Sequence, residues 1–276
     1  MRCGIEIVPF GAYADPNLVV ELAVAAEAAG WEAVSLWDHA HFWGGVADPW
    51  VTLAAVAVRT STIRLITGVS PVPRYRPHLL ARSLGSLNAL SGGRVVFGAG
   101  IGEPSDLDPV GDGDAPRARA ARADEALPLI ARWCAGETVE HRGEHYTADG
   151  VQVCPVPAWG SLPVWVGGMS EAALRRASRW DGWFAGCIDE TLSVAVGPEQ
   201  IATSVERLRQ LREHTERPLA FEIAVNGTTD PGGPRGVDLP AAYADAGASW
   251  WFESLFGLRG SHAEMLARVA AGPPPT

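Results

Sequence analysis

The chain has 276 residues, of which 32 are acidic and 22 basic, so its formal net charge is −10. This excess of carboxylates disfavours binding to nucleic acid or to an anionic membrane surface. Every basic residue is an arginine, which excludes reactions that depend on a lysine, such as Schiff-base catalysis. No apolar run reaches the roughly 18 residues of a membrane helix, and the N-terminus lacks the layout of a signal peptide. We therefore expect a cytoplasmic protein without a membrane or nucleic-acid partner.

Strand-like and helix-like segments alternate along the chain. The first helix shows the pattern: Asp15 is a good N-cap, Pro16 suits the first helical position, and Gly30 stops the helix. The predicted strands are residues 3–8, 33–37, 63–69, 94–97, 164–166, 183–185, 219–225 and 249–252. The predicted helices are residues 16–29, 49–60, 77–90, 117–134, 170–180, 198–214, 239–246 and 261–271.

Eight strands that are each followed by a helix predict a parallel sheet. In a chain of this length they favour one α/β domain over residues 1–276, a closed (β/α)8 TIM barrel. Residues 138–153 are predicted to form a hairpin, a small insertion after strand 4. An open, doubly wound sheet is the alternative that the sequence leaves open.

The four cysteines are Cys3, Cys134, Cys154 and Cys187. None stands at the C-x-x-C spacing of a zinc or thioredoxin-like site. We therefore expect reduced, mostly buried thiols.

Residues 38–43, directly after the second predicted strand, combine a carboxylate, two imidazoles and two large aromatic rings. Barrels carry function in the loops at the carboxyl ends of their strands, so Asp38 and His39 are the candidate catalytic residues. A histidine there could hydrogen-bond a cofactor or donate a proton. Two alternatives stay open: a metal held by Asp38, His39 and His41, and a structural loop that Asp38 caps. Since no further His/Asp pair completes a ligand set, we expect no metal.

Glycines follow two other strands. Gly98 to Glu103 imitate a dinucleotide-binding fingerprint but have Glu103 at the third glycine position, and residues 104–114 do not open a helix directly. Gly98 and Gly100 would instead let a flat ligand approach the backbone. Gly167 and Gly168 lead into a predicted helix, whose N-terminal amides could bind phosphate without a lysine; a plain tight turn is the alternative.

Several short motifs stand in order along residues 4–190. They include Gly30-Trp31, Trp37-Asp38-His39, Asp48-Pro49, Gly68-Val69, Arg76-Pro77, Gly93-Arg94, Gly98-x-Gly100, Gly167-Gly168 and Trp180-Asp181-Gly182-Trp183. Together they resemble the bacterial luciferase-like flavin-dependent oxidoreductases. The resemblance implies a TIM barrel, often a homodimer, that binds FMN or the deazaflavin coenzyme F420 at its carboxyl face.

The resemblance also assigns cofactor-binding positions. A non-prolyl cis peptide would fall at Gly68–Val69, where the bulge with Ser70 would support the cofactor ring. The phosphate site would fall on Gly167, Gly168 and Met169, helped by Cys187 in the loop after Gly186. These positions join Gly98 and Gly100 as the expected cofactor-binding residues.

The expected function is that of an oxidoreductase or monooxygenase acting on a small organic substrate. His39 would hydrogen-bond the ring or the substrate, and Asp38 would fix its tautomer. The Asp-His pair resembles the F420-using members, whose anionic cofactor tail would find Arg74, Arg76 and the arginines of 117–122 at the rim. FMN would instead call for a flavin reductase as partner. A non-catalytic flavin-binding barrel and a phosphate-handling lyase or isomerase are the alternatives.

Overall fold

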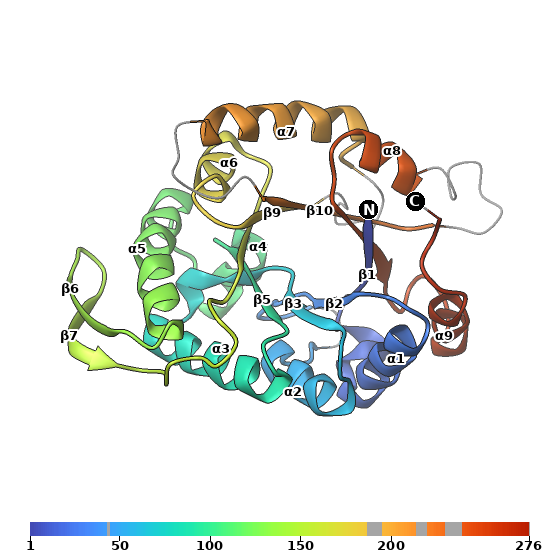
Figure 1. Cartoon of the computed structure of the whole chain (residues 1–276), viewed down its shortest axis with the longest axis horizontal. Helices are drawn as coiled ribbons and strands as arrows, with labels where there is room; N and C mark the ends of the chain where they lie inside the picture. Colours follow the sequence, from blue (N-terminus) through green and yellow to red (C-terminus); the bar gives the residue numbers. More distant parts are fainter. Residues whose placement is uncertain (43–44, 187–194, 214–219, 230–238, 276) are drawn as a thin grey trace.

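A closed barrel of parallel strands forms the centre of the computed structural model, which describes residues 1–42, 45–186, 195–213, 220–229 and 239–275 (Figure 1). Its eight strands are β1 (Arg2–Ile7), β2 (Ala33–Leu36), β3 (Arg64–Thr67), β5 (Val95–Gly100), β8 (Val164–Gly167), β9 (Gly182–Ala185), β10 (Glu222–Gly227) and β11 (Trp250–Leu255). Pairing of β1 with β11 and of β3 with β5 closes the ring within the described residues. The two-residue β4 (Ser70–Pro71) pairs with the end of β5. The prediction of a (β/α)8 TIM barrel is confirmed.

Helices surround the strands (Figure 1). They are α1 (Pro16–Ala28), α2 (Pro49–Arg59), α3 (Pro77–Ser91), α4 (Pro104–Leu107), α5 (Pro116–Cys134), α6 (Glu171–Ala177), α7 (Pro198–Arg212), α8 (Leu239–Asp245) and α9 (His262–Ala270). Side chains start several of them: the Asp15 carboxylate accepts from the Asn17 amide and the Asp48 carboxylate from the Val51 amide, which satisfies amides that the first turn leaves unpaired. No helix among the described residues is long and apolar enough to span a bilayer.

The insertion after the fourth barrel strand is the predicted hairpin, β6 (Thr138–Arg142) with β7 (Thr147–Gln152). It projects beyond the ring of helices, next to α5 (Figure 1). Several boundaries differ from the sequence prediction, and two of the differences lie near the carboxyl end of β5. The sequence prediction had no helix opening at residue 104, but residues 104–107 form the short helix α4. Pro104 stands in its first turn, where a proline favours a helix start. Strand β5 continues through Gly100, because Ala99 and Gly100 pair with β4.

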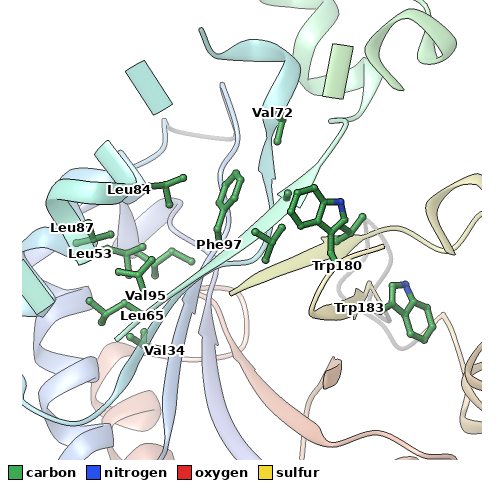
Figure 2. Packing of buried hydrophobic residues seen from close by; sticks show 14 of the residues in the cluster. Val34, Leu53, Leu65, Val72, Leu84, Leu87, Val95, Phe97, Trp180 and Trp183 are labelled. Atoms are coloured by element: carbon green, nitrogen blue, oxygen red, sulfur yellow. The ribbon is translucent and has the colours of Figure 1, made fainter. Parts of the chain in front are cut away.

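The core has an outer and an inner layer. In the outer layer, Val34, Leu65 and Val95 of neighbouring strands meet Leu53 of α2 and Leu84 of α3, as Figure 2 shows. The inner layer fills the barrel with a separate apolar cluster: Ala33, Ile66, Val96, Trp165, Phe184, Ala224, Trp250 and Phe252. Alternate residues of each strand supply the two layers. The second residue after an inner apolar residue therefore also faces the inside of the barrel, nearer to its carboxyl mouth.

Candidate functional site

Asp38 lies just beyond the carboxyl end of β2, and its side chain is fully buried. The Arg74 guanidinium donates to its Oδ1 atom, and the Tyr75 hydroxyl donates to Oδ2 at 2.8 Å. Arg74 and Tyr75 come from the 3-10 turn Val72–Arg74 and the residue after it. Burial raises the pKa of Asp38, and the charge of Arg74 opposes that shift. Asp38 is thus the centre of an ion pair that joins the loops after β2 and β3.

His39 is held by a different carboxylate. Its Nδ1 atom lies 3.4 Å from Oδ1 of Asp106, which belongs to α4. The same Oδ1 accepts the amides of Ala40 at 2.8 Å and His41 at 3.3 Å. The expectation that Asp38 fixes the His39 tautomer is therefore wrong. Asp38 is already engaged by Arg74 and Tyr75, and Asp106 is the carboxylate placed against the imidazole.

Aromatic rings enclose His39. The Trp37 ring lies 5.5 Å from it and the Phe42 ring 5.8 Å, measured between centroids. Phe42 in turn packs against buried Phe10 at 4.5 Å. Trp43, the last aromatic residue of this loop, lies outside the described residues. The imidazole is thus positioned by a carboxylate on one side and by apolar rings around it, while 29% of its side chain stays exposed.

The peptide between Gly68 and Val69 is cis, as the resemblance implies. The Val69 side chain that follows lies beside the glycines of the neighbouring strands. A Cβ atom on Gly100 would lie 2.7 Å from Cγ2 of Val69, and one on Gly167 would lie 2.9 Å from the same atom. A Cβ on Gly98 would lie 1.7 Å from the Thr67 carbonyl oxygen. These three glycines thus accommodate the bulge and Val69, and a role for Gly98 and Gly100 beside a flat ligand stays a prediction.

The predicted phosphate-binding residues sit where β8 meets α6. Gly168 has a φ of +112°, which favours glycine, and its carbonyl accepts from the Trp183 indole at 2.8 Å. The hydroxyl of Ser170 accepts from the Ala173 amide and so already caps α6. Met169 packs partly buried against the core between them. Cys187, the remaining predicted cofactor residue, lies outside the described residues.

Glu6 is a buried carboxyl in the barrel that sequence reasoning missed. Its Oε2 atom accepts from the Asn226 amide at 2.7 Å and from the Ser254 hydroxyl at 2.8 Å, while Oε1 has no hydrogen-bond partner among the described residues. Burial raises the pKa of Glu6, against the donors of Asn226, Trp37 and Ser254. The available signal was Glu6 itself, a charged residue in an otherwise apolar strand. It stands two positions after Gly4, so the two residues share the inner face of the barrel.

The arginines proposed for the rim divide into two groups. Arg74 is paired with Asp38 and lies 3.7 Å from Asp106, and buried Arg119 donates to the carbonyls of Ile101 at 3.1 Å and Gly102 at 3.2 Å. These two side chains hold the site together and are not free cations, so that expectation is wrong for them. Arg122 donates to Asp114 and to the Pro73 carbonyl. Arg76 and Arg117 are exposed.

Buried polar atoms near the bulge test whether a flavin-like group suits the site. The Ser35 hydroxyl is buried without a hydrogen-bond partner among the described residues, and a Cβ on Gly68 would lie 2.2 Å from it. Glu6 Oε1 is another such atom among the described residues. Unmatched buried polar groups are rare and call for an explanation, and a ring with polar edges over an apolar face fits them. Within the described residues, no group of three or more His, Cys, Asp or Glu side chains could hold a metal ion.

The fold and site define a class: a TIM-barrel protein with a histidine, a buried carboxyl and a bulge after the third strand at the carboxyl mouth of the barrel. Comparisons with known proteins then show the family. Residues 6–229 match the luciferase-like monooxygenase family. An uncharacterised protein of Mycobacterium tuberculosis is 31% identical over 235 residues, which cover 78% of each chain. The chain belongs to the luciferase-like monooxygenase family.

Two further proteins show the range of relatives. An F420-dependent glucose-6-phosphate dehydrogenase of Nakamurella multipartita is 36% identical over 172 residues, or 59% of this chain and 50% of the dehydrogenase. The chain thus matches about half the length of that relative. The structure of a monooxygenase from Streptomyces bottropensis superposes with a TM-score of 0.79 at 19% identity, covering 98% of this chain and 96% of the other. That likeness shows the shared fold.

Proposed function

We propose that this protein is an oxidoreductase that uses F420, or alternatively FMN, to oxidise or reduce a small organic substrate. The observation that carries the proposal is His39, partly exposed and held by Asp106 in an aromatic setting at the mouth of the barrel. The match to an F420-dependent dehydrogenase supports F420 as the first choice. Either cofactor supplies a tricyclic ring that accepts or donates a hydride, and the protein supplies position and polarity.

The residues around the bulge would hold the ring. Val69 offers an apolar surface over the three glycines, while the Ser35 hydroxyl and Glu6 Oε1 are buried polar atoms ready for a partner. Gly167, Gly168 and Met169 remain the proposed phosphate-binding residues. Exposed Arg76 and Arg117 remain candidates for the anionic tail of F420.

His39 would move or hold a proton at the reacting atom of the substrate. Its Nδ1 atom faces Asp106, which leaves Nε2 as the atom available to a substrate. General acid–base catalysis by such a group typically contributes about 10²–10⁴-fold in rate. Asp38 takes no direct part in this proposal: with Arg74 and Tyr75 it keeps the loop that carries His39 in place.

The first experiment is to titrate the purified protein with F420 and FMN separately and follow cofactor fluorescence. We expect saturable binding of F420. The loaded protein would then receive glucose 6-phosphate and a panel of primary and secondary alcohols while the absorbance of oxidised F420 is recorded. Saturable F420 binding with no reduction by any donor would favour a non-catalytic flavin-binding barrel, and binding of neither cofactor would refute the proposal.

An FMN-dependent monooxygenase is the second candidate. The family description and the Streptomyces bottropensis structure both favour it. In that case FMN binds more tightly than F420, and turnover requires a flavin reductase and oxygen. Oxygen consumption with chemically reduced FMN would distinguish this activity from that of the dehydrogenase. Sedimentation analysis of the same sample would test the homodimer that we also propose.

A further inference from the structure

Two cysteines meet on the outside of the barrel, far along the chain from the His39 loop. Cys134 is the last residue of α5, and Cys154 follows the hairpin strand β7. Both thiols donate to one carbonyl oxygen, that of Ala81 in α3, at 3.7 Å for Cys134 and 3.2 Å for Cys154. A thiol has one hydrogen, so the Cys134 S–H can alternatively point to the sulfur of Cys154, an interaction that shifts the pKa of both thiols. The two sulfur atoms, which share the Ala81 carbonyl as acceptor, therefore lie close together at a junction of three segments.

Small reagents can reach this junction. A cavity of about 170 Å³ lies beside it, lined by Leu84, Asn88 and Cys134 on one side and by residues 155–159 on the other. Val156 and Trp159 of that lining are 74% and 52% exposed, so the cavity is bordered by surface residues. Each sulfur belongs to a buried residue, but Cys134 forms part of the cavity wall and Cys154 precedes Pro155 of the same wall.

The two thiols differ in pKa, so one is suited to attack the oxidant and the other to form the disulfide afterwards. The hydrogen bond from Cys134 lowers the pKa of Cys154, and the charge of Arg82 acts in the same direction. The same hydrogen bond, together with burial, raises the pKa of Cys134. Cys3 offers a contrast, because burial raises the pKa of that thiol to about 11. A thiolate is the reactive form of cysteine, so Cys154 is the better nucleophile of the three.

We propose that Cys134 and Cys154 form a dithiol site that a hydroperoxide oxidises to an intramolecular disulfide. In the first step the Cys154 thiolate attacks one peroxide oxygen, the O–O bond breaks, and a sulfenic acid forms while hydroxide or alkoxide takes up a proton. In the second step the Cys134 sulfur attacks the Cys154 sulfur, the S–S bond forms, and the sulfenic oxygen leaves as water with the Cys134 proton. Two thiols are oxidised and one peroxide is reduced. A dithiol reductant reverses the reaction by thiol–disulfide exchange.

The disulfide would close a loop that contains the hairpin β6–β7. A cross-link between residues 134 and 154 restricts the unfolded chain, which stabilises the folded state. We therefore expect the oxidised protein to unfold at a Tm several degrees above that of the reduced protein. The bond would also remove both S–H donors from the Ala81 carbonyl.

The test uses the full chain and hydrogen peroxide. After oxidation, free thiols are blocked with N-ethylmaleimide and the protein is digested without reduction. We expect a cross-linked peptide joining Cys134 to Cys154 in the mass spectrum, a loss of two of the four thiols, and recovery of both with dithiothreitol. Cys134→Ser and Cys154→Ser should each abolish the cross-link and the rise in Tm, whereas Cys3→Ser, the matched control, should retain both.

A second probe measures proximity without oxidation. Phenylarsine oxide bridges two neighbouring thiols, so it should bind the reduced protein with one-to-one stoichiometry and lose that binding in Cys154→Ser. The proposal is overturned if peroxide leaves all four thiols free, if it drives one cysteine to sulfinic acid without a cross-link, or if the cross-link involves Cys3 or Cys187. Failure of phenylarsine oxide to bind the wild-type protein would contradict the proposed proximity.

Discussion

The Nδ1 atom of His39 lies 3.4 Å from Oδ1 of Asp106, a residue 67 positions later whose carboxylate also accepts two amides of the His39 loop. Asp106 is only 6% exposed. One carboxylate thus sets both the orientation of the imidazole and the path of the backbone that carries it. The loop after β2 and the short helix α4 therefore act as one unit.

Asp106→Asn tests this relationship. The amide keeps the size of the side chain but loses the charge that faces His39, so the imidazole should lose its fixed orientation. Displacing a reacting group by about 1 Å can cost about 100-fold in rate, and we expect a fall in kcat/KM of that order with unchanged cofactor binding. Steady-state kinetics across pH should also show a displaced profile, which a purely structural defect would not produce.

Asp112→Asn is the matched control for this variant. Asp112 is exposed in the loop that follows α4, and its backbone makes hydrogen bonds to Leu107 and Asp114 there. Its kcat/KM should equal that of the wild type. Equal kinetics for both variants would remove Asp106 from the catalytic arrangement.

Arg74→Met should destabilise the protein strongly. It leaves the buried carboxylate of Asp38 without its cation and removes the positive charge near Asp106. Breaking a buried ion pair by removing one partner typically costs about 3–5 kcal/mol. Urea unfolding should show this loss, while Arg76→Met, at an exposed arginine two residues away, should stay within about 0.5 kcal/mol of the wild type. Similar unfolding curves for the two variants would show that the pair contributes nothing.

Gly100→Ala should be destabilising, and Val69→Ala should rescue it. The added methyl group lies 2.7 Å from Cγ2 of Val69, while the next nearest atoms lie at 3.7 Å or beyond. Overpacking of this kind typically costs about 1–3 kcal/mol. In the double variant the clash is gone, so thermal unfolding should reveal a favourable coupling between the two substitutions. Strictly additive effects would mean that Gly100 is needed for some other reason.

Glu6→Gln should change how stability depends on pH. Burial raises the pKa of Glu6 above its ordinary value of 4.5, so the folded protein binds a proton there that the unfolded chain releases. The stabilising contribution is therefore complete below pH 4.5 and is lost as pH rises towards the folded-state pKa. From pH 5 to 8 the wild type should lose free energy of unfolding relative to Glu6→Gln, as measured in urea. Parallel pH curves would show that Glu6 is ionised in both states.

Local sequence was sufficient to predict the repeating architecture. Caps such as Asp15 and Asp48, prolines at first helical turns and glycine stops depend on interactions within a few residues, so the helices and strands could be assigned along the chain. Eight strand–helix units in one chain then indicated a barrel. The resemblance added the position of the cis peptide, which spacing alone could not have given.

Only the tertiary structure decided the partners inside the site. Asp38 is adjacent to His39 in sequence, yet the two side chains have different partners, because Arg74 comes from the 3-10 turn after β4 and Asp106 from the helix α4 after β5. In the sequence, Glu6 is a single charge in an apolar strand. Its hydrogen-bond donors Asn226 and Ser254 are 220 and 248 residues away in the chain, so only the fold brings them beside it. Local patterns fix which face a residue occupies, whereas ring closure fixes which distant side chains share that face. The chemistry at the mouth of the barrel therefore depends on ring closure, because it brings together side chains that are far apart in the sequence.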